Sequence, residues 1–308
     1  LVSEAEFAFD AGYHLMAMLV KNMGKLGAYL AARAVNPIRN SIKIAPSTYD
    51  VPVGYFEAWG VLTNTVPSCP IRGAGEPEGQ YTPERLMDAA ALELGRGRID
   101  LRRRNLVSSA QLPYRTVTSL EYDCGDFHAN LKRALELSDR TGYAGRQAIS
   151  EASGFLRGFG ICNTIEALGF GLDEEADVRC FPDGTAVLRI GSMSNGQGHE
   201  TIYAQILAGK LGLPIEKIKV IQGDTNEIRY GTGTGACRSI IVGGSAVSET
   251  TDRVIKIGQT LAAGFLEVAS EDIKFVDGCY VVVGTDRRAT FGKIVEMAGG
   301  LEACERFM

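Results

Sequence analysis

Residues 178–201 read VRCFPDGTAVLRIGSMSNGQGHET, and this stretch carries the clearest fold signal in the chain. Two short apolar segments, 178–181 and 186–190, flank Pro182-Asp183-Gly184, which is a typical hairpin turn. A glycine-rich loop at residues 192–201 follows, and apolar residues spaced for one face of a helix come after it. The stretch therefore predicts a β-hairpin, a glycine loop and a helix in that order.

Outward from this stretch, further apolar patterns predict strands and helices along the whole chain. The predicted strands span residues 5–9, 15–20, 155–170, 218–221, 273–276 and 280–283. The predicted helices span residues 82–94, 127–137, 202–211 and 247–268, and a last one starts at Phe291. Thr82 is the expected N-cap of the first helix, with Pro83 at its first helical position.

Strands and helices interspersed with hairpins favour an α+β fold with mixed, largely antiparallel sheets. A length of 308 residues suits two domains of about 150 residues each. We expect one domain over residues 1–106, a connector over 107–150 and a second domain over 151–308. The chain opens without a Met, in what resembles a strand, so both ends are expected to be cuts in a longer chain.

Composition excludes several classes of protein. Hydrophobic residues make up 45% of the chain, which is ample for a buried core and argues against disorder. A net charge of −5 argues against a nucleic-acid partner, which would require concentrated Lys and Arg. No apolar run reaches the ~20 residues that span a bilayer, and no signal-peptide pattern is present. The expectation is a soluble, cytoplasmic protein without a membrane partner.

Cysteines and arginines give weaker signals. The seven cysteines form no C-x-x-C pair, so we expect free, buried thiols, and neither a zinc ribbon nor an iron–sulfur site on this chain. Arg102, Arg103 and Arg104 are consecutive. In a net-acidic chain they are expected on a solvated face or in salt bridges at a domain interface.

The loop at residues 194–201 has the composition of an anion site. Its glycines let backbone N–H groups approach an anion, and the following helix N-terminus adds its dipole. Gln197, His199 and Thr201 can donate further hydrogen bonds. The loop lacks the Lys of a P-loop and the spacing of G-x-G-x-x-G, and a tight turn between strand and helix is the alternative explanation.

The small number of histidines limits which catalytic sites the chain can build. A histidine at a helix start, such as His199, is more often a capping donor than a metal ligand, and His14 and His128 are the only other histidines. No zinc site with three histidines can be built from them, and no G-x-S-x-G motif is present. A metal hydrolase and a serine hydrolase are both disfavoured.

Taken together, several segments resemble one family in order and spacing. They are residues 196–201 (GQGHET), 211–214 (LGLP), 222–225 (QGDT), 230–239 (YGTGTGACRS), 72–78 (RGAGEPE) and 101–105 (LRRRN). This set is similar to the molybdopterin-binding large subunits of the molybdenum hydroxylases, the group of xanthine dehydrogenase, aldehyde oxidase and carbon monoxide dehydrogenase. The likeness covers nearly the whole chain.

The resemblance implies a cofactor site built from three segments, with no side chain ligating the metal directly. In the implied site, one segment cradles the phosphates of molybdopterin, which is expected in its cytosine dinucleotide form. A second segment approaches the metal from one side, and a third closes around the pterin or its dinucleotide tail. The residues in these three roles are, respectively, Gly196, Gln197, Gly198, His199 and Thr201; Arg72, Gly73 and Ala74; and Ala236, Cys237, Arg238 and Ser239.

The resemblance also implies a reaction and partners. The family inserts water-derived oxygen into a C–H bond of a small molecule, and electrons leave through [2Fe–2S] clusters to FAD, here expected on partner chains or domains beside the remaining parts of the large subunit. A non-catalytic fragment or assembly module that keeps the fold without cofactor is the alternative.

This chain departs from the family pattern at defined positions. Copper-containing carbon monoxide dehydrogenases have a cysteine where this chain has Gly73, and purine-oxidising members have a phenylalanine at Ala74. An aldehyde or another N-heterocycle is therefore the expected substrate. The family's base, a glutamate in a Gly-x-Gly-Glu segment, is expected beyond Met308, so no catalytic residue is assigned in this chain.

Overall fold

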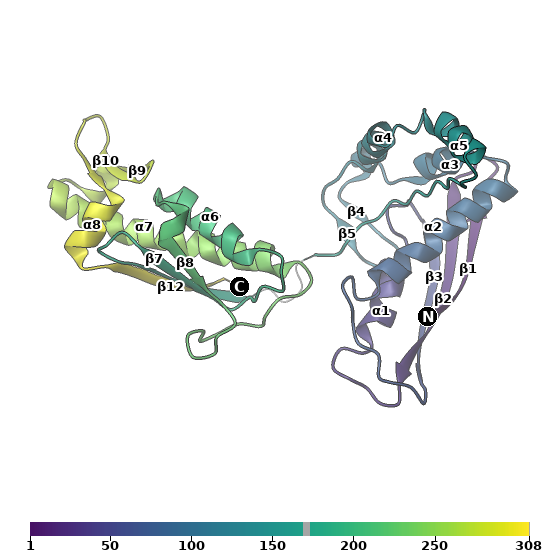
Figure 1. Cartoon of the computed structure of the whole chain (residues 1–308), viewed down its shortest axis with the longest axis horizontal. Helices are drawn as coiled ribbons and strands as arrows, with labels where there is room; N and C mark the ends of the chain where they lie inside the picture. Colours follow the sequence, from purple (N-terminus) through teal and green to yellow (C-terminus); the bar gives the residue numbers. More distant parts are fainter. Residues whose placement is uncertain (169–172, 308) are drawn as a thin grey trace. The chain divides into compact units, whose positions relative to one another are not determined.

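The computed structural model describes residues 1–168 and 173–307, which fold as two compact units. The first unit is Leu1–Ala167 and the second is Leu168–Met308. Each combines helices with sheets of its own (Figure 1). Among the described residues most strand pairs are antiparallel and two are parallel, which confirms the α+β prediction. Within the described residues, no helix is both long and apolar enough to cross a bilayer.

The first unit is built on a three-stranded sheet in the order β1-β2-β3. β1 and β2 form the predicted antiparallel hairpin, and β3 runs parallel to β2. Helices α1 and α2 contact this sheet, and Met18, Val20 and Met87 are among the buried residues of the core. The elements are β1 (Val2–Phe9), β2 (Leu15–Gly27), α1 (Asn36–Lys43), β3 (Val53–Leu62), α2 (Glu76–Glu93), α3 (Arg98–Asn105), η1 (Ser109–Gln111), β4 (Tyr114–Arg115), β5 (Glu121–Tyr122), α4 (Phe127–Leu137) and α5 (Tyr143–Ala152).

The start of α2 differs from the prediction. The helix begins at Glu76, after Gly75, so Thr82 is not its N-cap and Pro83 lies inside it. Pro83 has no N–H to donate to the carbonyl of Gly79, one turn earlier. A Cβ on Gly79 would lie 2.4 Å from the carbonyl oxygen of Ser41, so the glycine allows α1 and α2 to pack closely. Packing against α1 therefore outweighs the local proline signal.

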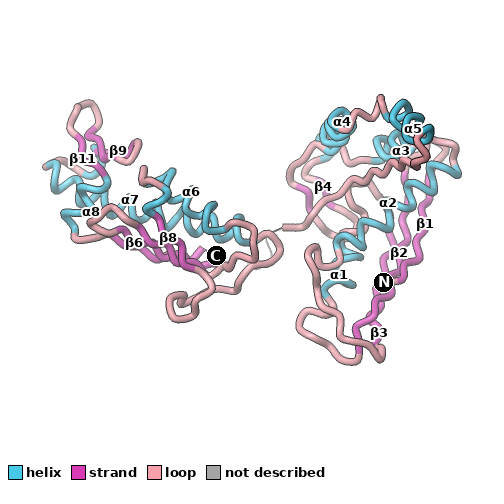
Figure 2. Tube along the Cα trace, in the orientation of Figure 1, coloured by secondary structure: helices cyan, strands magenta, loops and turns pink. Residues whose placement is uncertain are grey.

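The segment predicted as a strand at 155–170 contains no strand over residues 155–168, and residues 169–170 lie outside the described part. Residues 155–168 run as a loop (Figure 2). Side chains of α2 provide partners that a neighbouring strand would otherwise supply. The amide of Gln80 donates to the carbonyl of Ile165 at 2.7 Å and accepts from its N–H at 2.9 Å. The apolar residues Phe155 and Leu156 at the start of this segment are exposed, so its apolar pattern does not mark a buried strand.

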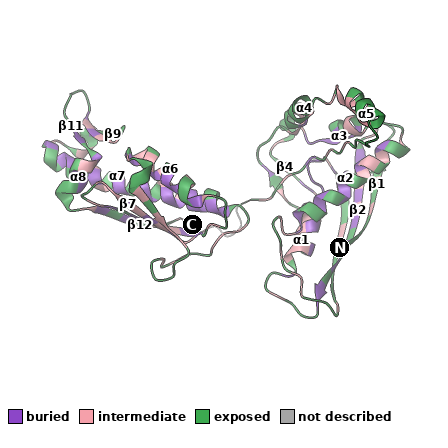
Figure 3. Cartoon of the chain, viewed as in Figure 1, coloured by how far each residue is buried: buried purple, intermediate pink, exposed green. Residues whose placement is uncertain are grey.

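The second unit is built on a four-stranded sheet in the order β12-β6-β7-β8. Buried and less buried residues alternate along β6 and β7, as expected when one face of a sheet is covered. Helices α6 and α7 contact this sheet, and their buried residues form the core with it (Figure 3). The elements are β6 (Glu174–Cys180), β7 (Ala186–Ile190), α6 (His199–Leu211), η2 (Ile215–Lys217), β8 (Ile218–Ile221), η3 (Ser239–Gly243), α7 (Gly244–Leu266), η4 (Ser270–Asp272), β9 (Ile273–Val276), β10 (Cys279–Val282), β11 (Arg288–Thr290), α8 (Phe291–Ala298) and β12 (Leu301–Phe307).

Local signals in the second unit are confirmed. The β6–β7 hairpin turns at residues 182–184, and the β9–β10 hairpin forms as predicted. The predicted strand 218–221 is β8, and the predicted helix at 202–211 is α6, which starts at His199.

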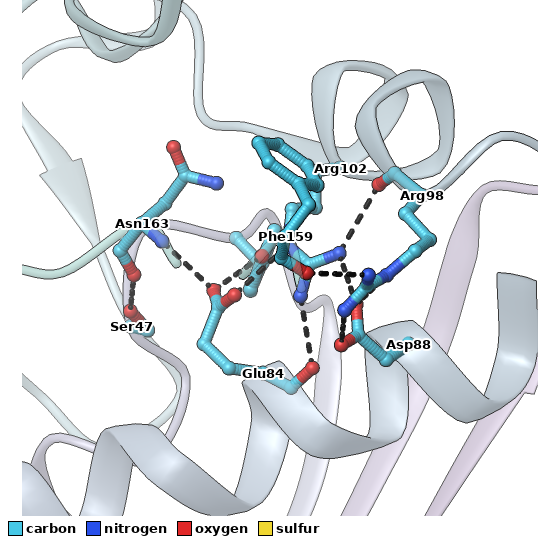
Figure 4. A network of polar contacts seen from close by, with 8 residues as sticks. Ser47, Glu84, Asp88, Arg98, Arg102, Phe159 and Asn163 are labelled. Carbon is cyan, nitrogen blue, oxygen red and sulfur yellow. Dashed lines mark hydrogen bonds and ion pairs between the residues drawn. The ribbon is translucent and has the colours of Figure 1, made fainter. Parts of the chain in front are cut away.

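Arg102 is not on a solvated face. Its side chain is fully buried at the end of α3 and is centred in a polar network (Figure 4). Its Nε donates to Glu84 at 2.8 Å, and Nη1 lies 2.8 Å from Asp88. Glu84 also accepts from the backbone N–H of Asn163 at 3.1 Å. The network therefore fixes the loop at 155–168 to α2 and α3.

Within the described residues the cysteines form no disulfide, as predicted, but most are not buried. Only Cys180 is buried and Cys279 is intermediate. The exposed ones are Cys69, Cys124, Cys162, Cys237 and Cys304.

Candidate functional site

The glycine loop before α6 has the backbone of an anion cradle. Gly196 and Gly198 have φ angles of 102° and 77°, in the left-handed region that favours glycine. Gly198 directly precedes α6 and no side chain caps the helix there. The first N–H groups of an α-helix have no acceptor within the helix, and its dipole favours negative charge at this end. Gln197 and Thr201 are exposed around them.

Two buried side-chain nitrogens beside this loop have no partner in the described part of the chain. His199 is 3% exposed, and its Nδ1 has no hydrogen bond there, so it is not a capping donor. The Nε2 of Gln222 is also unpartnered, while its Oε1 accepts from the N–H of Ser194 at 3.1 Å. Buried polar groups in proteins are normally satisfied. Nitrogens without an acceptor at a helix N-terminus fit a phosphate-bearing group.

Tyr203 joins this loop to the next one. Its ring lies 5.6 Å from the ring of His199, and burial raises the pKa of its hydroxyl. The hydroxyl donates to the carbonyl of Ser239 at 2.6 Å and shares a 2.7 Å hydrogen bond with Ser192. The end of β7, the first turn of α6 and the start of the helix after residue 239 are therefore held together.

The loop at residues 230–239 is also strained and partly open. Ala236 and Cys237 are exposed and have φ angles of 48° and 56°, unusual values for residues with a side chain. A π-helix, η3, follows directly and leads into α7. Single π-turns and strained non-glycine residues both occur preferentially at functional sites.

Arg238 anchors this loop from the inside. Its guanidinium is nearly buried and lies 3.0 Å from Glu174, which is fully buried, and it also donates to the carbonyls of Gly233 and Asp173. Burial raises the pKa of Glu174, and Arg238 acts in the opposite direction. The guanidinium of Arg238 therefore contacts other groups of the protein, and Arg238 influences the exposed side of the loop through the backbone carbonyls that it holds.

The residues expected near the metal lie in the first unit. Gly73 and Ala74 have positive φ angles, and the amide of Asn40 donates to the carbonyl of Ala74 at 3.1 Å. A Cβ on Gly75 would lie 1.9 Å from the carbonyl oxygen of Pro37, so this turn is pressed against α1. Arg72 is exposed, and its side chain makes no hydrogen bond or ion pair with the described residues.

The structure brings together two of the three predicted segments, 196–201 and 236–239, through Tyr203. It places Arg72, Gly73 and Ala74 in the other unit. Sequence reasoning gave no role to Tyr203, Glu174 or Gln222, although Gln222 belongs to the QGDT segment that it singled out. Glu174 also offered a signal, because it is an acidic residue at an inward position of an alternating strand. Across residues 1–168 and 173–307, no three His, Cys, Asp or Glu side chains gather as a metal site.

Two family models match the sequence of this chain. Both describe a molybdopterin cofactor-binding domain, one over residues 1–106 and the other over residues 134–308. The second alone covers more than half of the chain. The chain belongs to the molybdopterin-binding large subunits of the molybdenum hydroxylases.

Known relatives and solved structures agree with this family. The carbon monoxide dehydrogenase large chain of Hydrogenophaga pseudoflava is 33% identical over 264 residues, covering 80% of this chain and 32% of that protein. Subunit gamma of the 6-hydroxypseudooxynicotine dehydrogenase complex of Paenarthrobacter nicotinovorans is 29% identical over 301 residues, covering 96% and 38%. Quinoline 2-oxidoreductase from Pseudomonas putida 86 superposes with a TM-score of 0.89 at 28% identity, covering 99% of this chain and 42% of that one. The chain thus spans about a third of the length of the curated relatives it matches.

Proposed function

We propose that this chain holds molybdopterin in its cytosine dinucleotide form as part of a hydroxylase that oxidises an N-heterocycle or an aldehyde. The observation that carries the proposal is the unpartnered, buried Nδ1 of His199 beside two left-handed glycines and the open N-terminus of α6. These groups are donors or can become donors, and the phosphates of a dinucleotide are acceptors.

Each segment has a part in this proposal. His199, Gln197, Thr201 and the backbone of Gly196 and Gly198 bind phosphate. Ala236, Cys237 and Ser239 close around the pterin, with Arg238 and Tyr203 fixing their backbone from below. The group, when bound, supplies the oxygen-inserting chemistry at a C–H bond.

Arg72, Gly73 and Ala74 are proposed to approach the metal side. The free guanidinium of Arg72 suits an anionic or electron-rich neighbour, and the small side chain at 74 leaves space for a ring. Gly73 stands where copper-containing enzymes carry a cysteine, which argues against a copper site. Relatives named for nicotine-derived substrates and for quinoline favour an N-heterocycle.

The proposal also includes partners and domain limits. Relatives that are large subunits of complexes support companion chains, which we assign as the [2Fe–2S] and flavin carriers. We retain residues 107–150 as the connector between parts of two binding domains, 1–106 and 151–308. In the structure, the residues from 107 to 167 belong to the first compact unit.

A matched pair of glycine variants tests cofactor binding in the protein purified with its natural partners. Gly198→Val places a branched side chain at φ 77° in the cradle, and Gly184→Val places it at φ 79° in the β6–β7 turn. We expect molybdenum content and released cytidine monophosphate to fall at least tenfold in the first variant and to remain in the second. Equal retention in both contradicts the cradle. Wild-type protein that carries neither molybdenum nor pterin supports the non-catalytic module instead.

A further inference from the structure

A cavity of about 720 Å³ opens on the first unit, and residues of that unit alone line it. Residues of α3 and α4, the turn between α4 and α5, and Phe159 line it. The volume lies in the range of small-molecule sites, roughly 300–1,000 Å³. Ile99, Leu135, Tyr143 and Phe159 supply half-buried apolar walls.

The acidic groups of this cavity are already engaged by other cations. Asp100 pairs with Arg103 at 3.1 Å. Glu136 pairs with Arg133 at 3.2 Å. The remaining acid, Asp139, accepts from Arg146, from the hydroxyl of Thr141 and from the N–H of Gly142.

One arginine of the cavity, Arg98, is also paired with a carboxylate. Arg98 binds both oxygens of Asp88 and donates to the carbonyl of Phe159 at 3.0 Å, which fixes the position of that ring (Figure 4). The Phe159 wall is therefore built on the same polar network that holds the loop at 155–168.

Two other cations are left without an acid in the described residues. The guanidinium of Arg140 lies 4.7 Å from the ring centre of Phe159 and 5.1 Å from that of Tyr143, and its Nε is buried without an acceptor. Lys132, exposed on α4, makes no ion pair there. Stacked guanidinium groups keep their N–H edges available for planar oxyanions. The uncompensated charge of the cavity is thus positive.

We propose that this cavity binds a small aromatic carboxylate. The carboxylate accepts hydrogen bonds from the terminal N–H groups of Arg140 and interacts with the ammonium of Lys132. The flat apolar body lies against Ile99 and Leu135, beside the rings of Tyr143 and Phe159. This site is independent of the cofactor proposal, because none of its lining residues belongs to the proposed cradle.

Ligand-detected saturation-transfer NMR on the full chain tests the proposal, with benzoate as the probe. We expect saturable benzoate binding, and at least tenfold weaker binding of benzamide, which has the same shape without the charge, and of acetate, which lacks the ring. Arg140→Gln is expected to weaken benzoate binding at least tenfold, because charge-assisted hydrogen bonds are lost.

Arg104→Gln is the matched control, since this exposed arginine of α3 lies outside the cavity and its loss changes the net charge equally. Lys132→Gln, at an exposed position, provides a second test and is expected to weaken binding at least threefold. Non-saturable binding, equal binding of benzamide, or equal effects of Arg140→Gln and Arg104→Gln would overturn the proposal.

Discussion

Glu76 is the carboxyl group whose ionisation should control the stability of the first unit. It is the first residue of α2 and is 8% exposed. Burial, reinforced by the nearby Glu166, raises its pKa from 4.5 to about 7, while the N–H of Ala167 and Lys43 act in the opposite direction. Glu166 and Ala167 belong to the loop that Gln80 and Glu84 fasten to the same helix, and Lys43 is the last residue of α1.

The direction in which stability changes with pH follows from proton binding to Glu76. Between pH 4.5 and about 7 the folded chain holds a proton on Glu76 that the unfolded chain has released. Stability from this group is therefore complete below pH 4.5 and is lost as pH rises through 7. A shift of this size corresponds to at most about 3 kcal/mol of the free energy of unfolding.

Glu76→Gln should remove this pH dependence. The amide carbonyl can still accept from Ala167 but never carries charge, so the variant should match wild type near pH 4 and exceed it by up to about 3 kcal/mol at pH 8. Urea unfolding followed by fluorescence measures this for the first unit, because Trp59 in β3 is the only tryptophan of the chain. Glu78→Gln, an exposed charge in the same helical turn, is the control. Parallel stability curves for Glu76→Gln and wild type from pH 4 to 8 would refute the reasoning.

Two packing predictions concern one buried position in each unit. Arg102→Met should lower the free energy of unfolding reported by Trp59 by about 3–5 kcal/mol, because Glu84 is left buried without its cation. Adding Glu84→Gln should recover part of the loss. A loss below about 1 kcal/mol for Arg102→Met contradicts this prediction. Gly258→Ala should lower the thermal midpoint of the second unit in far-UV circular dichroism, because its Cβ would lie 2.0 Å from the hydroxyl of Tyr280. That clash costs about 1–3 kcal/mol, more than the ~1 kcal/mol gained in helix propensity. An unchanged midpoint would count against it.

The elements predicted correctly are those whose signal is local. The turn at residues 182–184 determines the β6–β7 hairpin through its own backbone preferences, and the left-handed Gly198 directly before α6 is a local signal for the start of that helix. The start of α2 could not be predicted, because Gly79 and Pro83 have their meaning only against α1. The loop at 155–168 could not be predicted for the same reason, since its hydrogen bonds go to side chains far away in sequence.

In the candidate site, too, the local features could be predicted from the sequence and the long-range contacts could not. Its surface, the glycine loop at 196–198, could be predicted because left-handed backbone requires glycine. The side chains that hold this loop and the loop at residues 230–239 in place could not be predicted, because Tyr203 and the Glu174–Arg238 pair act through contacts between distant segments. A buried ion pair is a weak source of stability, because desolvation offsets most of its attraction. What Glu174–Arg238 can supply is a single conformation for an irregular loop that has no apolar pattern of its own. By this reasoning Arg238 shapes the loop at residues 230–239 through the carbonyl of Gly233. The groups left to meet an anion are the backbone amides of the cradle, His199 and the exposed side chains around it.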